Sequence, residues 1–271
     1  MDQPKESAQS PAHRLPDAVD SVRVLAVVIL GVVGLMAAAP KALWAQVAAV
    51  EVPFLLGPLL YVFGLRLAPG PSLGVRLPGA RTLVLVVLAS LSSMWLLNGL
   101  VIVQEWLLVR AGHGRYVEHV HQQLEKPIIE VLLRQPGTAF ALFSLAPALC
   151  EEFLFRGVVF RGFVRSFTPA RGVLYTALLF AAVHVEPLKM LPMFALGLFF
   201  AALALWTRSI WSSVIAHAAN NAAVLFVAKL SHDLSAPVGE EGPWSVYVLS
   251  AAVFVPAMAL LWGDYREAES R

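Results

Sequence analysis

The amino-acid sequence predicts an all-α polytopic membrane protein with about eight transmembrane helices. Hydrophobic residues make up 58% of the 271 residues and charged residues only 14%, whereas a soluble domain carries about 25% charged residues. The mean hydropathy is +0.72. The apolar residues also gather in segments that approach the roughly 20 residues an α-helix needs to cross a bilayer.

Eight such segments follow one another along the chain: 22–39, 44–65, 82–103, 138–160, 171–186, 190–206, 209–228 and 245–263. The second contains Pro53 and Pro58, so we expect a kink there. The fifth and sixth are short and are separated by Pro187 and Pro192. These two form either a broken pair or a crossing of locally thinned membrane. Residues 104–137 predict an extramembrane helix that lies against the bundle.

The distribution of lysine and arginine places both termini in the cytoplasm, because positive residues concentrate on the inner side. We therefore expect an integral protein of the bacterial cytoplasmic (inner) membrane. Residues 1–20 are polar, unlike a cleavable signal peptide, and predict a disordered cytoplasmic tail. Residues 21–137 carry the first three transmembrane helices and the loop helix. Residues 138–228 form a core with helices four to seven, and 229–271 hold a loop, the last transmembrane helix and a short tail.

Charge and cysteine content exclude several classes of function. The net charge is +2 and there are no basic runs, which argues against nucleic acid as a partner. The single cysteine, Cys150, excludes an intrachain disulfide and any multi-cysteine metal site.

Ionisable side chains inside predicted spans are functional candidates, because their burial in a membrane costs several kcal/mol. The segment LCEEFLFRGVVF is the clearest case. The candidates in the fourth, fifth and seventh segments are Glu151, Glu152, Arg156, His184 and His217, with Asn220 and Asn221 beside the last.

These groups are predicted to lie at one depth. Counted from the arginine at the inner end of each helix, Glu151, His184 and His217 lie roughly 13 to 19 Å into the membrane at ~1.5 Å per residue. Three helices thus place polar groups in one layer, open toward the cytoplasmic half. This agreement favours one shared site.

The spacing within each helix adds detail. Glu152 and Arg156 are four residues apart, so they share a face and can pair. Glu151 points about 100° away from Glu152 and is expected to face the cavity. His217 and Asn221 also lie on one stripe. We therefore favour Asn221 over Asn220 as the partner of His217.

Two carboxylates and two imidazoles suit the activation of water for attack on a carbonyl carbon. Glu151 is the candidate general base, with His184 sharing the water. Glu152 would stay ionised and orient its neighbours, while His217 and Asn221 would donate to the developing oxyanion.

Two other chemistries use the same residues. A zinc ion held by Glu151, His184 and His217 would keep one position open for water. A transporter would instead relay protons through the buried groups. Such a protein is expected to show inverted repeats, and the sequence contains no internal repeat.

Three short motifs resemble those of one protease family. EEFLFR (Glu151, Glu152, Arg156), FAAVH (Phe180, His184) and HAANN (His217, Asn221) resemble the EExxxR, FxxxH and HxxxN/D motifs of the CPBP intramembrane proteases, also called CAAX protease or Abi proteins. The resemblance covers about residues 138–228.

This resemblance implies the Ras-converting-enzyme fold and an endopeptidase that cleaves protein or peptide substrates at the membrane. It implies that Glu151 and His184 activate water and that His217 and Asn221 form the oxyanion hole. Family names include the word metalloprotease. We favour the glutamate mechanism, which requires no cofactor, with zinc as the alternative.

Two residues, Cys150 and Phe180, have alternative roles, and one further function remains as an alternative. Cys150 precedes Glu151 and would serve an acyl-enzyme if the chain resembles the myxosortase type, which processes C-terminal tags. It is otherwise a buried packing residue. Phe180 is expected to pack or to line the substrate groove. A non-catalytic scaffold or immunity protein that keeps the motifs is the remaining alternative.

Overall fold

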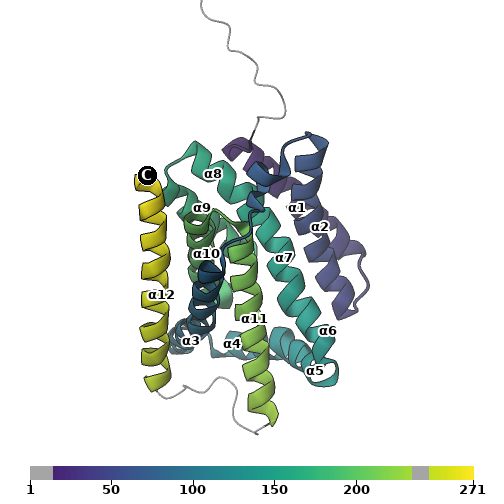
Figure 1. Cartoon of the computed structure of the whole chain (residues 1–271). Helices are drawn as coiled ribbons and strands as arrows, with labels where there is room; N and C mark the ends of the chain where they lie inside the picture. Colours follow the sequence, from purple (N-terminus) through teal and green to yellow (C-terminus); the bar gives the residue numbers. More distant parts are fainter. Residues whose placement is uncertain (1–14, 234–243) are drawn as a thin grey trace, which may run out of the picture.

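A computed structural model describes residues 15–233 and 244–271 as a bundle of helices (Figure 1). The described residues contain no strand. Seven helices among them are long and apolar enough to cross a membrane. The prediction of an all-α polytopic membrane protein is therefore confirmed. The greater part of the predicted tail (1–14) and of the last loop (234–243) lies outside the described residues.

The helices follow one another with short connections. The elements are α1 (Ala18–Ala38), α2 (Leu43–Gly64), η2 (Gly70–Gly74), α3 (Ala80–Arg110), α4 (Gly114–Val120), η3 (His121–Glu125), α5 (Lys126–Arg134), α6 (Pro136–Phe140), η4 (Ala141–Leu145), α7 (Ala146–Glu152), η5 (Phe153–Val159), α8 (Phe160–Ser166), α9 (Pro169–Ala182), α10 (Pro187–Thr207), α11 (Ile210–Asp233) and α12 (Trp244–Ser270). The elements α6 to α8 form one helical span, Pro136–Ser166.

The predicted fifth span is shorter than expected. Segment 171–186 becomes α9, a helix of 14 residues that ends at Ala182. Two features end it: Val185 has a left-handed φ of 52°, and the residue before Pro187 is disfavoured in a helix. Seven long spans and one short apolar helix thus replace the eight predicted spans.

The first span begins inside the region predicted to be a tail. Asp17 caps α1, because its carboxylate accepts the backbone N–H of Asp20 at 2.9 Å. The Asp20 carboxylate accepts the N–H of Asp17 in return, at 3.3 Å. This reciprocal capping box satisfies two N–H groups that a helix start leaves open, so helix α1 begins at Ala18.

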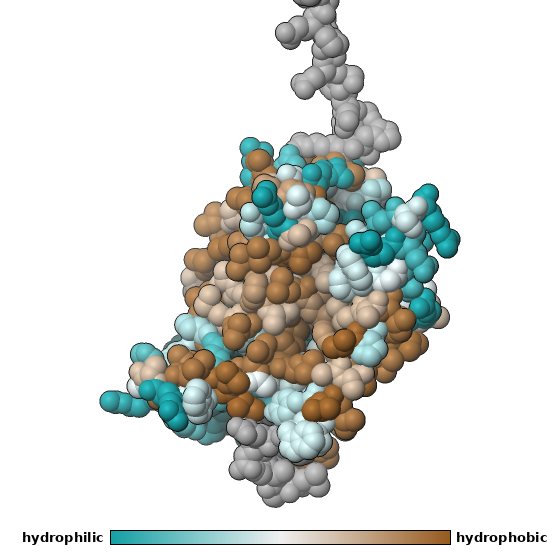
Figure 2. Space-filling view, turned by 90° about the vertical axis from the view of Figure 1, so that its left-hand side faces the viewer, coloured by the Kyte–Doolittle hydropathy of each residue, from teal (hydrophilic) through white to brown (hydrophobic). Residues whose placement is uncertain are grey.

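Both ends of the described chain lie at the same end of the bundle. Figure 1 places the start of α1, α8 and the C-terminal end of α12 together, with α4 and α5 at the opposite end. On the face drawn in Figure 2, hydrophobic residues cover the middle and hydrophilic residues gather mostly toward the two ends. This is the surface pattern of a protein that spans a bilayer.

The span Pro136–Ser166 contains two π-helical turns, η4 and η5. A π-turn disturbs the regular backbone hydrogen bonds, and such turns are frequent at functional sites. The Ser21 hydroxyl of α1 lies within hydrogen-bond distance of two carbonyl oxygens of η5, 3.3 Å from Val158 and 3.2 Å from Val159, and 2.9 Å from the Asp17 carbonyl of its own segment. The α1 helix therefore supports the turn that carries Arg156.

Close approach of α9 and α10 depends on Gly197. A Cβ atom at this position would lie 2.9 Å from the Ala177 Cα atom and 3.1 Å from its carbonyl oxygen. Small residues at membrane helix contacts allow backbones to approach in this way.

We expect Gly197→Ala to lower the free energy of unfolding by about 1–3 kcal/mol, because the added methyl group meets backbone rather than a movable side chain. Denaturant unfolding in detergent measures this. Gly263→Ala in α12 is the matched control, since no atom lies within 4 Å of its Cβ position. Equal stability of the two variants would contradict the proposed close contact.

An ionic cluster joins the extramembrane helices to the end of α3. The His121 ring lies 3.3 Å from the Glu105 carboxylate and 2.7 Å from that of Glu125. Burial lowers the pKa of His121, but the hydrogen bond to Glu125 and the charges of Glu125 and Glu105 outweigh it, so the pKa of His121 is raised.

A histidine with a raised pKa stabilises the folded state below its unfolded pKa of 6.5. That contribution is lost as the pH rises through the higher folded value. We expect wild-type protein to melt above His121→Gln at about pH 6 and the two to converge at about pH 9. Melting curves in detergent at both pH values test this, and a difference that grows with pH would contradict it.

Candidate active site

Arg156 and Glu152 form a fully buried ion pair inside the fourth span. Arg156 Nη1 donates to Glu152 Oε1 at 2.9 Å, and both side chains have 0% exposure. Arg156 Nη2 donates to the Gly197 carbonyl of α10 at 3.0 Å. The predicted spacing of four residues therefore brings this pair together, and the arginine also ties η5 to α10.

Aromatic rings enclose the guanidinium group. Its central carbon lies 4.7 Å from the Phe180 ring centre and 5.3 Å from that of Phe200. A cation over an aromatic face is stabilised by the ring quadrupole, more strongly when water is excluded. The rings thus offset part of the cost of removing Arg156 from water.

His217 joins this network from α11. Its Nδ1 atom lies 3.0 Å from Glu152 Oε1, and its ring stacks on Phe200 at 4.8 Å between centres and 21° between planes. An ionised carboxylate only accepts hydrogen bonds, so Nδ1 carries the proton that is donated to Glu152. In the neutral ring, Nε2 then carries the lone pair.

Serine hydroxyls fix the backbone of α11 on both sides of His217. Ser90 of α3 donates to the Ala216 carbonyl, and Ser144 of η4 donates to the Ala218 carbonyl at 2.9 Å. Helix α11 is therefore held by two neighbouring spans where the imidazole projects from it.

Glu151 occupies a separate position. Its side chain is only 8% exposed, and its Oε2 atom has no hydrogen-bond partner among the described residues. The sequence predicted His217 as an oxyanion donor, and the structure places its Nδ1 atom 3.0 Å from Glu152 Oε1. Arg156 therefore pairs with Glu152 as predicted, and Glu151 lies outside this pair. His217 contacts Glu152.

His184 lies in the turn after α9 and not within a helix. Its Nδ1 atom is 2.7 Å from the Phe180 carbonyl oxygen, so Nδ1 donates. The Phe180 ring lies 5.0 Å from the His184 ring and 6.2 Å from the His217 ring. One phenyl ring therefore contacts both imidazoles. Within the described residues, no hydrogen bond joins His184 to Glu151.

The extramembrane helices hold the turn that carries His184. The Tyr116 hydroxyl of α4 donates to the Glu186 carboxylate, and Gln104 Nε2 donates to the Pro187 carbonyl at 2.7 Å. The turn is thus connected both to α3 and to α4.

The two asparagines of α11 differ in burial. Asn220 is 4% exposed, and its Oδ1 atom has no partner among the described residues. Asn221, the predicted partner of His217, is only partly buried. Its role as an oxyanion donor stays a prediction.

The predicted zinc ligands do not gather. Among the described residues, no group of three or more His, Cys, Asp or Glu side chains is placed to hold a metal ion. The arrangement of Glu151, His184 and His217 therefore does not fit a three-ligand zinc site.

Sequence reasoning missed Glu51, a buried carboxylate in α2. It is 8% exposed, its Oε2 atom has no partner among the described residues, and α2 packs against α7, which carries Glu151. The sequence could have revealed Glu51, because it is an ionisable residue within the predicted span 44–65. The same criterion selected Glu151. Cys150 is 6% exposed and packs in the main hydrophobic cluster.

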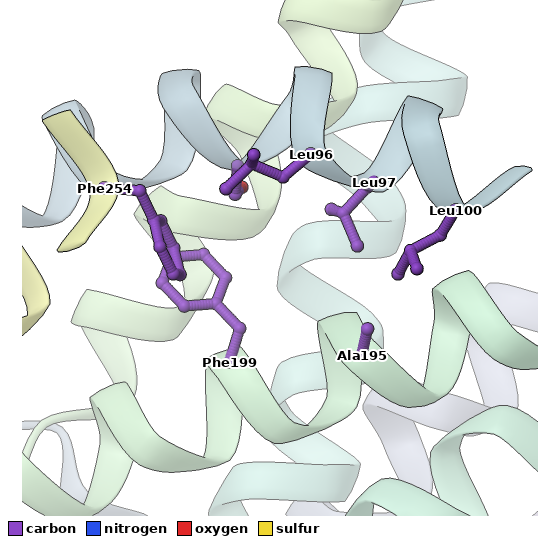
Figure 3. Close-up of a pocket in the computed structure, with 7 residues that line it drawn as sticks. Leu96, Leu97, Leu100, Ala195, Phe199 and Phe254 are labelled. Atoms are coloured by element: carbon purple, nitrogen blue, oxygen red, sulfur yellow. The ribbon is translucent and has the colours of Figure 1, made fainter. Parts of the chain in front are cut away.

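An apolar hollow of about 170 Å³ lies between α3, α10 and α12 (Figure 3). Leucines of α3 face Ala195 and Phe199 of α10 and Phe254 of α12 across it. None of the predicted site residues lines it. The hollow is therefore separate from the polar cluster.

The polar cluster falls within a segment that matches a known family. Residues 134–223 match the family described as type II CAAX prenyl endopeptidase Rce1-like. The chain thus contains an Rce1-like domain, and that family is one of proteases. No curated protein and no solved structure matches the chain.

We expect Arg156→Met to lower the free energy of unfolding by about 3–5 kcal/mol, because it leaves the Glu152 charge buried without its cation. The double variant Glu152→Leu with Arg156→Met removes both charges and is expected to recover most of that loss. Denaturant unfolding in detergent compares the two. A single variant as stable as wild type would contradict a structural role for the pair.

Proposed function

We propose that this protein is an intramembrane endopeptidase in which Glu151 activates a water molecule for attack on a peptide carbonyl. The observation that carries the proposal is the buried network of Glu152, Arg156 and His217 inside a membrane span. The Rce1-like match over residues 134–223 supports it, because the network lies within that segment. A bundle without function would have little reason to retain this network in an apolar span.

The proposed reaction is hydrolysis. Glu151 takes a proton from water as the water oxygen bonds to the carbonyl carbon, which gives a tetrahedral oxyanion. The carbon–nitrogen bond then breaks, and the proton held by Glu151 passes to the leaving amine. The products are a carboxylic acid and an amine, so Glu151 ends the cycle ionised.

The hydrogen-bond directions assign different tasks to the two histidines. His184 donates from Nδ1 to the Phe180 carbonyl, so its Nε2 lone pair is open to accept from the attacking water. His217 donates from Nδ1 to Glu152, so it donates to an oxyanion only when Nε2 is protonated as well. Glu152 then accepts a hydrogen bond from that imidazolium as well as from Arg156. Asn221, or the more buried Asn220, would supply the second donor.

The location of the site within the membrane bundle supports a substrate that lies at the membrane. We propose a membrane-associated or C-terminally tagged protein that reaches the bundle from the bilayer. The name of the matching family supports a C-terminal segment as the target. Phe180 touches both imidazoles and is proposed to border the bound peptide.

We propose that both termini face the cytoplasm of a bacterial inner membrane. The start of α1, α8 and the end of α12 lie at one end of the bundle (Figure 1). Arg161, Arg165, Arg171, Arg208 and Arg266 lie in or beside α8, the start of α9, the end of α10 and the end of α12. Positive residues of this kind mark the cytoplasmic side.

We expect Glu151→Gln to reduce cleavage of a membrane-anchored reporter by at least ~10²-fold, because the amide cannot accept the proton from water. The melting temperature is expected to stay near that of wild type. Glu130→Gln, at an exposed position of α5, is the matched control. Cleavage at the wild-type rate by Glu151→Gln would overturn the proposal.

The same assay separates the alternative mechanisms. Burial of Cys150 in the hydrophobic cluster supports a packing role, so Cys150→Ser is expected to keep full turnover. Loss of turnover with a normal melting temperature would instead assign the thiol to an acyl-enzyme. Full activity after chelation is expected on the glutamate mechanism, and activity that returns only with added zinc would favour the metal alternative.

A further inference from the structure

Helix α2 presents a carboxylate to the face that carries Glu151. Phe54 lies three residues after Glu51, and Phe155 lies four residues after Glu151. Residues at these spacings share a helix face. The Phe54 and Phe155 rings contact each other edge to face at 6.1 Å between centres. The face of α2 with Glu51 therefore meets the face of the fourth span with Glu151.

Neither carboxylate is fully satisfied in this contact. Glu51 and Glu151 are each 8% exposed, and each has one buried oxygen without a hydrogen-bond partner among the described residues. Glu51 forms no ion pair within the described part of the chain, whereas Glu152 has Arg156. Helix α2, which carries Glu51, packs directly against α7, which carries Glu151.

Two neighbouring carboxylates in an apolar setting do not both ionise, because each negative charge disfavours the other and burial disfavours both. A single proton between them removes the repulsion. The shared proton also joins one oxygen of each carboxylate in a hydrogen bond, and buried polar atoms require such a partner. A pair of this kind titrates as a unit, and its proton belongs to the pair.

We propose that Glu51 and Glu151 form a carboxyl pair that holds one proton, with Glu51 as the positioning residue for Glu151. Glu51 carries the proton and donates it as a hydrogen bond to Glu151, which remains the anion that accepts a proton from water. This assignment of a role in cleavage rests on the proposed function. The shared proton does not depend on it.

Infrared spectroscopy tests the proton without any substrate. At pH 7, the difference spectrum of wild type minus Glu51→Gln is expected to contain the carbonyl band of a protonated carboxyl group. The difference against Glu130→Gln is expected to contain only ionised carboxylate bands, since that residue is exposed. Absence of the protonated band from the first difference spectrum would overturn the carboxyl pair.

Kinetics test the positioning role. Glutamine mimics a neutral hydrogen-bond donor, so Glu51→Gln is expected to keep kcat within about threefold of wild type. Leucine cannot donate, so Glu51→Leu is expected to lower kcat by about tenfold to a hundredfold with KM unchanged, the range for a lost hydrogen bond to a charged group. A Leu variant with wild-type kcat, or a Gln variant that loses as much as the Leu variant, would overturn the role.

The two proposals fail in different ways. A wild-type protein that cleaves no tagged membrane substrate refutes the endopeptidase, and the infrared difference alone then decides whether the pair exists. An active wild type that is abolished by Glu151→Gln but unaffected by Glu51→Leu retains the endopeptidase and refutes the role of Glu51. The melting temperature of Glu51→Leu shows whether that variant folds. If it does not, the infrared difference between wild type and Glu51→Gln still tests the carboxyl pair.

Discussion

The burial of the Arg156 guanidinium is the constraint on which the rest of the structure depends. An arginine with no exposure inside a membrane span is costly unless an anion matches its charge. The carboxylate of Glu152 supplies the charge, the Gly197 carbonyl accepts from the far side, and two phenyl rings exclude water. Meeting these needs requires η5, α9, α10 and α11 to converge at one place.

Several features follow from that convergence. Helix α10 approaches α9 closely enough to leave no room for a side chain at Gly197, and this brings its carbonyl to Arg156. Phe200 contacts both Arg156 and the His217 ring, so one residue shields a cation and packs on an imidazole. The same residues therefore pack the helices and hold the polar network. A substitution at one of them is expected to affect both.

Much of the fold was predictable, because a bilayer imposes length and apolarity on each span. The exception was the fifth segment, where hydropathy continued to Glu186 but the helix ended at Ala182. Hydropathy reports the surroundings of a residue and not its backbone conformation. The left-handed Val185 and the following Pro187 decide the end of this helix.

The candidate site was predictable only in part. Spacing along one helix identified Glu152 and Arg156 as a pair, since such contacts are local. Spacing did not reveal which glutamate contacts His217. That contact depends on how α11 is rotated against the fourth span and on the π-helical segment η5 that follows Glu152. Glu51 was overlooked although its position within an apolar segment was visible, because no motif includes it.

The placement of Glu152 and Arg156 on one helix also bears on biosynthesis. Spans that enter a membrane in chain order reach it before their later partners, and here α10 and α11 follow the fourth span. Since the two opposite charges are one helical turn apart, they neutralise each other before either later helix arrives. The pair therefore enters as an electrically neutral unit, and the histidine and the glycine carbonyl later bind to groups that are already paired.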